Sequence, residues 1–176
     1  MKLPEFFKVL DAHAGSVPLD VLTAELGKLD ICCDDVGDCV CFGDDRYKRN
    51  LLRVTDAYAA LILCWKPGQA SPIHDHRGSA CGIRVLRGEV TETRYDRDAS
   101  GHLSEAGTDR YPVGAVCGSF DSDIHVICNN QAPGNDLVTL HIYTPPMREF
   151  NLYQLGSTEV GVYVDENMPV RGASVR

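Results

Sequence analysis

HDHRGSAC, residues 74–81, is the stretch that decides the fold of this chain. It contains two histidines one residue apart, and side chains at positions i and i+2 of a β-strand point to the same side. His74 and His76 can therefore direct two imidazoles into one cavity, as neighbouring metal ligands must. Apolar runs flank the stretch on both sides, so we expect this cavity to lie inside a β-barrel.

The spacing of residues around the two histidines extends the pattern. Residues 68–88 read G-x5-H-x-H-x4-C-x6-G, and residues 112–129 read PVG, a gap, and then His125 with an asparagine four positions later. These two groups resemble the first and second cupin motifs. They depart from the usual pattern because Cys81 stands in place of the glutamate ligand and because the gap before His125 is longer.

The candidate metal ligands are His74, His76 and His125. Three neutral imidazoles suit Fe, Zn, Ni or Cu, and geometry decides among these metals. Without a carboxylate ligand the metal keeps its full dipositive charge, which favours an anionic substrate such as a thiolate. Asp75 should point to the opposite face of the strand, where a structural role is expected.

The composition argues against two classes of partner. The chain has 176 residues, 44% of them hydrophobic, and a formal net charge of −8. Nucleic acids require a basic patch and anionic membranes a polybasic segment, so neither partner is expected. No apolar run approaches the roughly 18 residues of a membrane span, and the N-terminus lacks the pattern of a signal peptide. We therefore expect a cytoplasmic protein, and a monomer.

The order of the predicted elements indicates a mainly β protein with a short helical start. One cupin domain is expected over residues 1–176. Within it, the apolar spacing predicts two short helices over residues 1–30, joined near His13, which is expected at the surface. Short apolar runs between turn residues predict an antiparallel, jelly-roll-like β-barrel over about 46–164. Residues 165–176 are expected to form a polar tail that frays.

Eight cysteines are many for a chain of this length. Because no signal peptide is expected, most of them are interpreted as reduced packing residues. Four lie in CCDDVGDCVC, residues 32–41, which is interpreted as a loop and the start of a strand. A structural zinc site and a disulfide are the alternatives for this segment. The sequence leaves open the role of its four cysteines, Cys32, Cys33, Cys39 and Cys41.

Six motifs within residues 46–146 carry a family resemblance. They are, in order, RYKRN, LILCW, HDHRGSAC, LRGEVTET, IHVICN and VTLHIYTPP. Together they resemble the thiol dioxygenases, and specifically the cysteine dioxygenase family. The resemblance implies a cupin barrel, Fe(II) held by the three histidines, O₂ as co-substrate, and oxidation of L-cysteine to cysteine sulfinic acid.

The same resemblance implies a substrate pocket. Arg49 matches the arginine that family members use to bind the substrate carboxylate, and a guanidinium can pair with a carboxylate through two parallel hydrogen bonds. Tyr47 would line the same pocket. Leu63 would form an apolar wall, and Trp65 would support it.

Tyr143 matches the active-site tyrosine of the family. The Ser-His-Tyr series of the family is here Thr139, His141 and Tyr143, so His141 would orient the phenol and would not bind the metal. Cys81 stands where the animal enzymes have a cysteine joined to the tyrosine, and a Cys81–Tyr143 thioether is therefore expected, with a free buried thiol as the alternative. The resemblance also implies a cis peptide before Pro145.

Three other functions stay open at this point. A dioxygenase for 3-mercaptopropionate or another small thiol acid would use the same site, although that branch usually carries a different residue in place of Arg49. A non-catalytic metal-binding cupin would explain the histidines but not the combination of Arg49, His141 and Tyr143. A zinc or nickel cupin isomerase normally keeps the glutamate that Cys81 replaces.

Overall fold

Two short helices precede the strands, as the spacing of apolar residues predicts. In the computed structural model, which describes residues 1–165 and 168, α1 spans Leu3–Asp11 and α2 spans Leu19–Lys28. His13 lies partly exposed in the turn between them. None of the helices in the described part of the chain is long and apolar enough to cross a membrane.

The segment expected to be a loop and the start of a strand is instead a 3₁₀ helix, η1, over Cys33–Cys39. The Asp35 carboxylate accepts a hydrogen bond from the backbone N–H of Cys32, at 2.8 Å, and so caps the first turn. An acidic or amide side chain at the third helical position that reaches back to the N–H before the helix forms one half of a capping box. All eight cysteines are free thiols, and the metal-ligand cluster found among the described residues contains none of them. The structure therefore forms neither the zinc site nor the disulfide considered for this segment.

The rest of the described chain is almost entirely β-strand. The strands are β1 (Lys48–Val54), β2 (Ala59–Trp65), β3 (Ile73–His74), β4 (Ala80–Arg87), β5 (Glu89–Arg97), β6 (Leu103–Pro112), β7 (Val116–Ser119), β8 (Ile124–Cys128), β9 (Leu137–Thr144), β10 (Glu149–Tyr153) and β11 (Gly161–Val164). They form a five-stranded sheet, ordered β1-β2-β9-β4-β7, and a six-stranded sheet, ordered β11-β10-β3-β8-β5-β6. All the pairings between strands are antiparallel.

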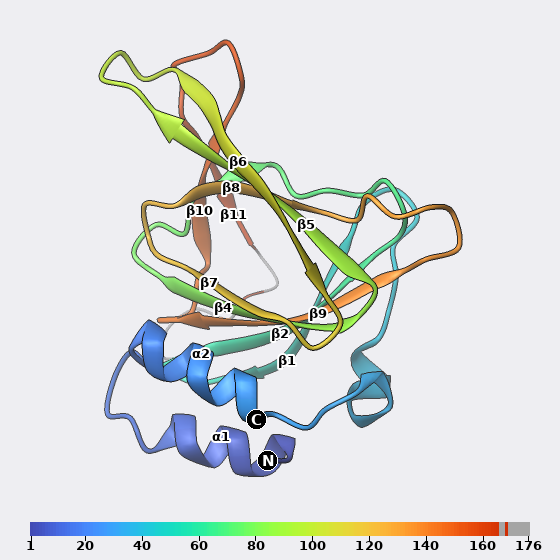
Figure 1. Cartoon of the computed structure of the whole chain (residues 1–176). Helices are drawn as coiled ribbons and strands as arrows, with labels where there is room; N and C mark the ends of the chain where they lie inside the picture. Colours follow the sequence, from blue (N-terminus) through green and yellow to red (C-terminus); the bar gives the residue numbers. More distant parts are fainter. Residues whose placement is uncertain (166–167, 169–176) are drawn as a thin grey trace.

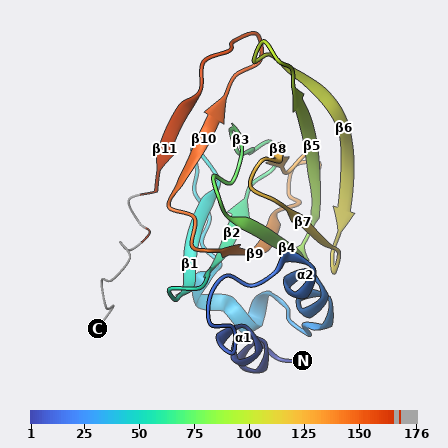
Figure 2. The ribbon, with the colours of Figure 1, turned by 90° about the vertical axis from the view of Figure 1, so that its left-hand side faces the viewer.

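The five-stranded sheet is covered on both faces. Figure 1 shows α1 and α2 beneath it, and Figure 2 shows the six-stranded sheet on its other side. Strand β2 is consequently buried along its whole length. Ile62 and Cys64 pack in the core on the helix side, whereas Leu63 and Trp65 belong to a second core with side chains of both sheets. A continuous apolar run is what a strand covered on both faces requires.

Two glycines allow α2 to lie close against the sheet. A Cβ at Gly82 in β4 would stand 2.7 Å from Leu26 Cδ1, and one at Gly118 in β7 would stand 2.8 Å from Thr23 Cγ2. Both distances are too short for real side-chain carbons. Glycine at these positions therefore permits a contact between helix and sheet that any larger residue would push apart.

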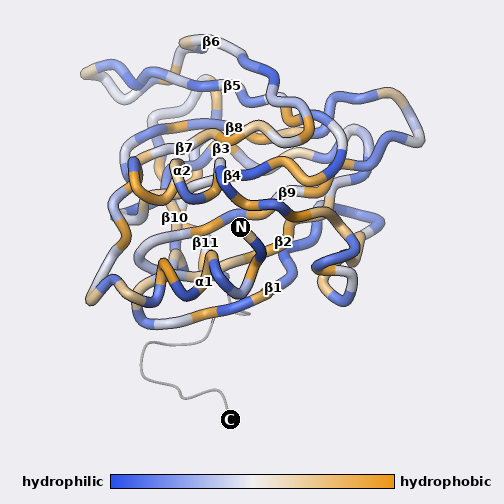
Figure 3. Tube along the Cα trace, turned by 60° about the horizontal axis from the view of Figure 1, so that its bottom comes forward, coloured by the Kyte–Doolittle hydropathy of each residue, from blue (hydrophilic) through white to orange (hydrophobic). Residues whose placement is uncertain are grey.

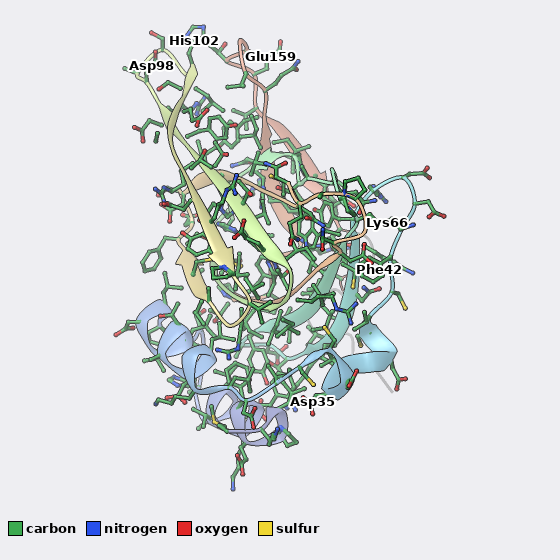
Figure 4. The ribbon with its side chains drawn as sticks, turned by 45° about the vertical axis from the view of Figure 1, so that its right-hand side comes forward. Asp35, Phe42, Lys66, Asp98, His102 and Glu159 are labelled. Atoms are coloured by element: carbon green, nitrogen blue, oxygen red, sulfur yellow. The ribbon has the colours of Figure 1, made fainter. Side chains whose placement is uncertain are left out.

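The polar end of the molecule lies far from the helices. Asp98 and His102 sit at the tip of the β5–β6 hairpin, near Glu159 in the connection between β10 and β11, whereas Asp35 lies at the opposite end (Figure 4). The outer part of this hairpin is mainly hydrophilic, while apolar segments concentrate in the body of the molecule (Figure 3). The apolar cores of the molecule therefore lie on the two faces of the five-stranded sheet, away from the tip of this hairpin.

The expected tail is only partly described. Asp165 and Met168 are 2% and 3% exposed, so the prediction of a fraying tail is wrong for these two residues. The other residues of that prediction, 166–167 and 169–176, lie outside the described part of the chain. The division of the chain into one domain stays a prediction.

Candidate active site

Three buried histidines meet between the two sheets. His74 ends β3 and pairs in register with His125 of β8, which brings their side chains together. His76 lies two residues beyond the end of β3, in the connection to β4. One nitrogen atom of each ring lies within 4.8 Å of the others. The three predicted ligands therefore gather at one point, although His76 is not on the strand that the sequence pattern suggested.

Backbone carbonyls fix two of the rings. His74 Nδ1 lies 3.0 Å from the carbonyl oxygen of Pro72, and His76 Nδ1 lies 3.2 Å from that of Phe120. A carbonyl can only accept, so each Nδ1 carries the proton and each Nε2 keeps its lone pair. Burial, followed by the nearby His125, lowers the pKa of both rings, that of His76 to about 3. Both are therefore neutral imidazoles, the form that binds metals.

The third ring is held by a carboxylate. His125 Nδ1 lies 2.5 Å from Glu92 Oε1, and the side chains are only 2% and 8% exposed. Burial acts to raise the pKa of Glu92, but the hydrogen bond from His125 outweighs it and leaves the pKa below its usual value. The other nitrogen, His125 Nε2, is buried without a hydrogen-bond partner among the described residues.

This arrangement fits a metal ion. An unpartnered buried nitrogen is costly unless a ligand satisfies it. A histidine whose far nitrogen donates to a carboxylate or a carbonyl is the usual form of a metal-binding histidine. Sequence reasoning noted that a carboxylate ligand was missing, but it did not find Glu92, which supplies a negative charge one ring away from the ligand position.

Arg49 lies at the side of the same site. It belongs to β1, and its Nε donates to Asp165 Oδ2 at 2.9 Å while its Nη1 donates to Tyr143 Oη at 3.3 Å. Its Nη2 is buried with no hydrogen-bond partner among the described residues. Burial opposes the charge, but Tyr143, Tyr47 and Asp165 outweigh burial and raise the pKa of Arg49. The site thus holds the permanently charged guanidinium of Arg49, whose Nη2 can still donate hydrogen bonds.

A chain of hydrogen bonds supports Tyr143 from behind. Trp65 Nε1 donates to Thr139 Oγ1 at 3.1 Å, and Thr139 Oγ1 lies 3.0 Å from His141 Nε2. His141 Nδ1 lies 3.2 Å from Tyr143 Oη. Burial lowers the pKa of His141 and raises that of Tyr143, so the imidazole and the phenol are both neutral. The predicted Thr139, His141 and Tyr143 series is present, and His141 is not in the metal cluster.

Cys81 and Tyr143 are direct neighbours across two strands. Cys81 of β4 pairs in register with Tyr143 of β9. Residues opposite each other in an antiparallel pair have Cβ atoms about 4.5–5.5 Å apart. The Cys81 thiol is fully buried, 3.8 Å from His141 Nδ1, and burial raises its pKa well above the usual value.

These side chains surround a narrow inner cavity, which opens beside a larger outer one. The inner cavity has a volume of about 10 Å³, and the outer one about 710 Å³. The inner cavity is lined by the three histidines and by all the other predicted site residues except Thr139, namely Tyr47, Arg49, Leu63, Trp65, Cys81, His141 and Tyr143. Tyr47 and Arg49 line both cavities. These two residues therefore stand between the outer cavity and the cavity of the histidines.

Tyr47 is kept in place by an aromatic partner. Its ring stacks on that of Trp65 with the centroids 4.0 Å apart and the planes at 12°. Because Trp65 also donates to Thr139, it links the pocket wall to the series that ends at Tyr143. The predicted supporting role of Trp65 thus has two physical parts, a stacked ring and a hydrogen bond.

Asp75 is not part of the metal cluster and lies just beyond the end of β3, so its hydrogen bonds to β10, and not strand alternation, set its direction. Its carboxylate accepts hydrogen bonds from the backbone N–H of Asn151 at 3.1 Å, from Asn151 Nδ2 at 2.8 Å and from Tyr153 Oη at 2.7 Å. These bonds tie the connection between the two histidines to β10. Asp75 thereby fixes the backbone that carries His74 and His76.

Sequence reasoning missed Glu92 and Asp165. Both are buried carboxylates, 6% and 2% exposed, that hold a functional side chain. Glu92 stands in the motif VTET with no spacing signal of its own, and Asp165 lies in the part of the chain that was expected to be a tail. A search for acidic residues at positions that the strand alternation assigns to the interior could have found Glu92.

Comparisons with known proteins give the family of this chain. A family model described as Cysteine dioxygenase type I matches residues 35–155. Two curated relatives, both named Cysteine dioxygenase type 1, are the Danio rerio protein, 31% identical over 112 residues, and the Rattus norvegicus protein, 32% identical over 109 residues. These alignments cover 61% and 60% of this chain, and 55% and 54% of the relatives. The chain thus spans about half the length of the curated relatives it matches.

Solved structures confirm the predicted cupin-type fold. An uncharacterized conserved protein with a double-stranded β-helix domain from Klebsiella pneumoniae matches with a TM-score of 0.53 at 16% identity, over 68% of this chain and 94% of its own. TT1209 from Thermus thermophilus matches with a TM-score of 0.52 at 18% identity, over 63% and 94%. With the family match covering most of the chain, the protein belongs to the cysteine dioxygenase type I family.

Proposed function

We propose that this protein is an Fe(II)-dependent thiol dioxygenase that oxidises L-cysteine with O₂ to cysteine sulfinic acid. One observation carries the proposal: the buried guanidinium of Arg49, with its Nη2 unpartnered among the described residues, lines the same cavity as the three histidines. A metal site alone would need no such cation. A cation beside a metal site suits a small substrate that has one group for the metal and a carboxylate for the arginine.

His74, His76 and His125 would hold the iron through Nε2, since Nδ1 of each ring already has an acceptor. Bound Fe(II) supplies a site for the substrate thiolate and for O₂, whose two oxygen atoms end on the sulfur. Three neutral ligands leave the metal positive, which favours the thiolate over the thiol. Glu92 moderates this charge through His125 without occupying a ligand position.

Arg49 would bind the substrate carboxylate with Nη2, and the bond from Nη1 to Tyr143 keeps the fork and the phenol in fixed relation. Orienting the substrate before reaction is the main contribution expected of such residues. Tyr47 and Leu63 would complete the wall around the substrate.

The series behind Tyr143 decides where the phenol proton points. Thr139 Oγ1 accepts from Trp65, so its own proton is available for His141 Nε2. His141 would then carry its proton on Nδ1 and donate it to Tyr143 Oη, which also accepts from Arg49. With both of these bonds accepted, the Tyr143 hydroxyl keeps its own proton to donate to a ligand in the cavity.

We infer in addition that Cys81 and Tyr143 form a thioether. Their register pairing in β4 and β9 supports a bond between the sulfur and the ring. The bond forms with loss of one hydrogen from the thiol and one from the ring, and O₂ is the oxidant that accepts both. Peptide mapping after turnover should find a joined Cys81–Tyr143 species lighter by two hydrogens, and only unmodified peptides would contradict this inference.

The test of the function is a thiol assay with matched variants. Iron-loaded protein, prepared without oxygen, is given L-cysteine, 3-mercaptopropionate or cysteamine in an oxygen electrode, and the products are identified by mass spectrometry. We expect L-cysteine to be preferred and to gain two oxygen atoms. Arg49→Ala should lose this preference, whereas Arg53→Ala, which changes a partly exposed arginine of the same strand that lines neither cavity, should keep it.

The alternatives give different results in the same assay. Preference for 3-mercaptopropionate would assign the protein to another thiol acid. Metal binding without oxygen consumption for any thiol would indicate a non-catalytic cupin. The monomeric state and the cytoplasmic location stay predictions.

A further inference from the structure

Asp165 is a buried acid that reaches the site from the far end of the described chain. It directly follows β11, and its Oδ2 accepts from Arg49 Nε at 2.9 Å, with side chains that are 3% and 12% exposed. The two residues are 116 positions apart in sequence. A buried ion pair at such a separation fixes one part of a fold against another.

The backbone on either side of this carboxylate is held. The N–H of Asp165 donates to the carbonyl of Arg148 at 2.8 Å, and the N–H of Met168 donates to the carbonyl of Asp165 at 3.1 Å. Met168 is itself packed in the core between the sheets. Asp165 is therefore a fixed acceptor, and the guanidinium must adjust to it.

The direction of the bond decides which hydrogens of Arg49 remain for a ligand. Asp165 occupies Nε, at the side of the guanidinium, and Tyr143 occupies one hydrogen of Nη1. Nη2 has no hydrogen-bond partner among the described residues. Arg49 lines both cavities, but Asp165 lines only the outer one. Asp165 therefore holds Arg49 at Nε from the side of the outer cavity, while Nη1 reaches Tyr143, which lines the inner cavity with the histidines.

We propose that Asp165 is a positioning residue for substrate recognition, which holds the Nη1–Nη2 end of Arg49 toward the carboxylate of the thiol substrate. This rests on the proposed function, because it assigns the carboxylate of that substrate to Arg49. It also goes beyond it, since it makes recognition of the carboxylate depend on a residue outside the inner cavity.

An opposite role for Asp165 predicts the opposite sign. As a competing anion, Asp165 would weaken the attraction of Arg49 for the substrate carboxylate, and its removal would tighten binding. As a positioning residue, it keeps a rigid fork aligned, and its removal weakens binding. A misplacement of about 1 Å in a fixed site can lower the reaction rate by about 100-fold.

The experiment compares thiols with and without a carboxylate, and it does not depend on turnover. Co(II)-loaded protein is titrated under nitrogen with L-cysteine or cysteamine, and binding is followed by the thiolate-to-metal charge-transfer band. For Asp165→Ala we expect the Kd of L-cysteine to rise about tenfold or more, with the Kd of cysteamine within about twofold of wild type. Glu149→Gln, which changes an exposed carboxylate on the neighbouring strand β10, is the matched control and should change neither.

Asp165→Asn is a second variant, in case Asp165→Ala fails to fold. Its amide oxygen can still accept a hydrogen bond from Arg49 Nε. It should recover most of the affinity for L-cysteine, because a positioning role needs the acceptor more than the charge. Equal weakening of both thiols would reveal a merely structural role and overturn the proposal, and so would tighter binding of L-cysteine. A wild-type protein that binds L-cysteine but makes no sulfinate would refute the proposed function while the Kd values still decide the role of Asp165.

Discussion

Replacing Glu92 by Gln should weaken metal binding even though Glu92 touches no metal. The carboxylate lies 2.5 Å from His125 Nδ1, and both side chains are almost completely buried. Gln has the same shape but no charge. If its oxygen faces the ring, the bond loses its charge assistance. If its amide group does, the proton of His125 is forced onto Nε2 and blocks the ligand position.

The expected size of the effect follows from this geometry. Partners of metal-binding histidines typically contribute about 10- to 100-fold to metal affinity. That range corresponds to about 1.4–2.7 kcal/mol. The close contact and the burial place Glu92→Gln toward the upper end of it, because a charged hydrogen bond is roughly twice as strong as a neutral one.

The measurement is a competition titration of metal-free protein with Co(II) against a chelator of known affinity. Glu89→Gln is the matched control, since Glu89 lies on the same strand with its side chain 36% exposed and 3.6 Å from Arg110. The reasoning is refuted if Glu92→Gln keeps the wild-type Kd, or if the control variant loses as much affinity.

Three further changes test other parts of the site. Asp75→Ala removes the acceptor of three hydrogen bonds from Asn151 and Tyr153; it should cost about 1–3 kcal/mol of unfolding free energy and lower Tm in calorimetry, unlike the exposed Asp96→Ala. His125→Ala should abolish metal binding in equilibrium dialysis, and retained stoichiometric metal would disprove the ligand assignment. Arg49→Lys keeps the charge but loses the fork, so steady-state kinetics should show the KM for L-cysteine rising by about 10-fold or more with a smaller change in kcat, and an unchanged KM would contradict the assigned contact.

The sequence predicted that the three histidines and most of the residues around the inner cavity would lie together, because their signals are local or carried by short motifs. His74 and His76 are recognisable by their spacing, and Arg49 and Tyr143 by the motifs around them. Glu92 and Asp165 have no such signal, since their roles depend on which strand pairs with which and in what register. Glu92 reaches His125 only because β5 pairs with β8.

The errors have physical reasons too. The spacing of the two histidines predicts one strand through both, but β3 stops at His74, and the backbone N–H of His76 donates instead to the carbonyl of Asp121, at 3.1 Å. The side chain of His76 still reaches the cluster because the Phe120 carbonyl holds its ring. In the segment 32–42, an aspartate at a helix start outweighed the β-preference of the apolar residues around it.

The two sheets divide the chemistry between them. The metal ligands belong to the six-stranded sheet or follow its strand β3, whereas Arg49, Cys81, His141 and Tyr143 all belong to the five-stranded sheet. In the proposed function, the six-stranded sheet would therefore hold the metal and the five-stranded sheet would hold the substrate. Substitutions in β1, β4 and β9 can change the thiol that is accepted without touching a metal ligand. Any drift of one sheet against the other would alter the span between metal and arginine, so the packing between the sheets sets the length of substrate that can bridge them.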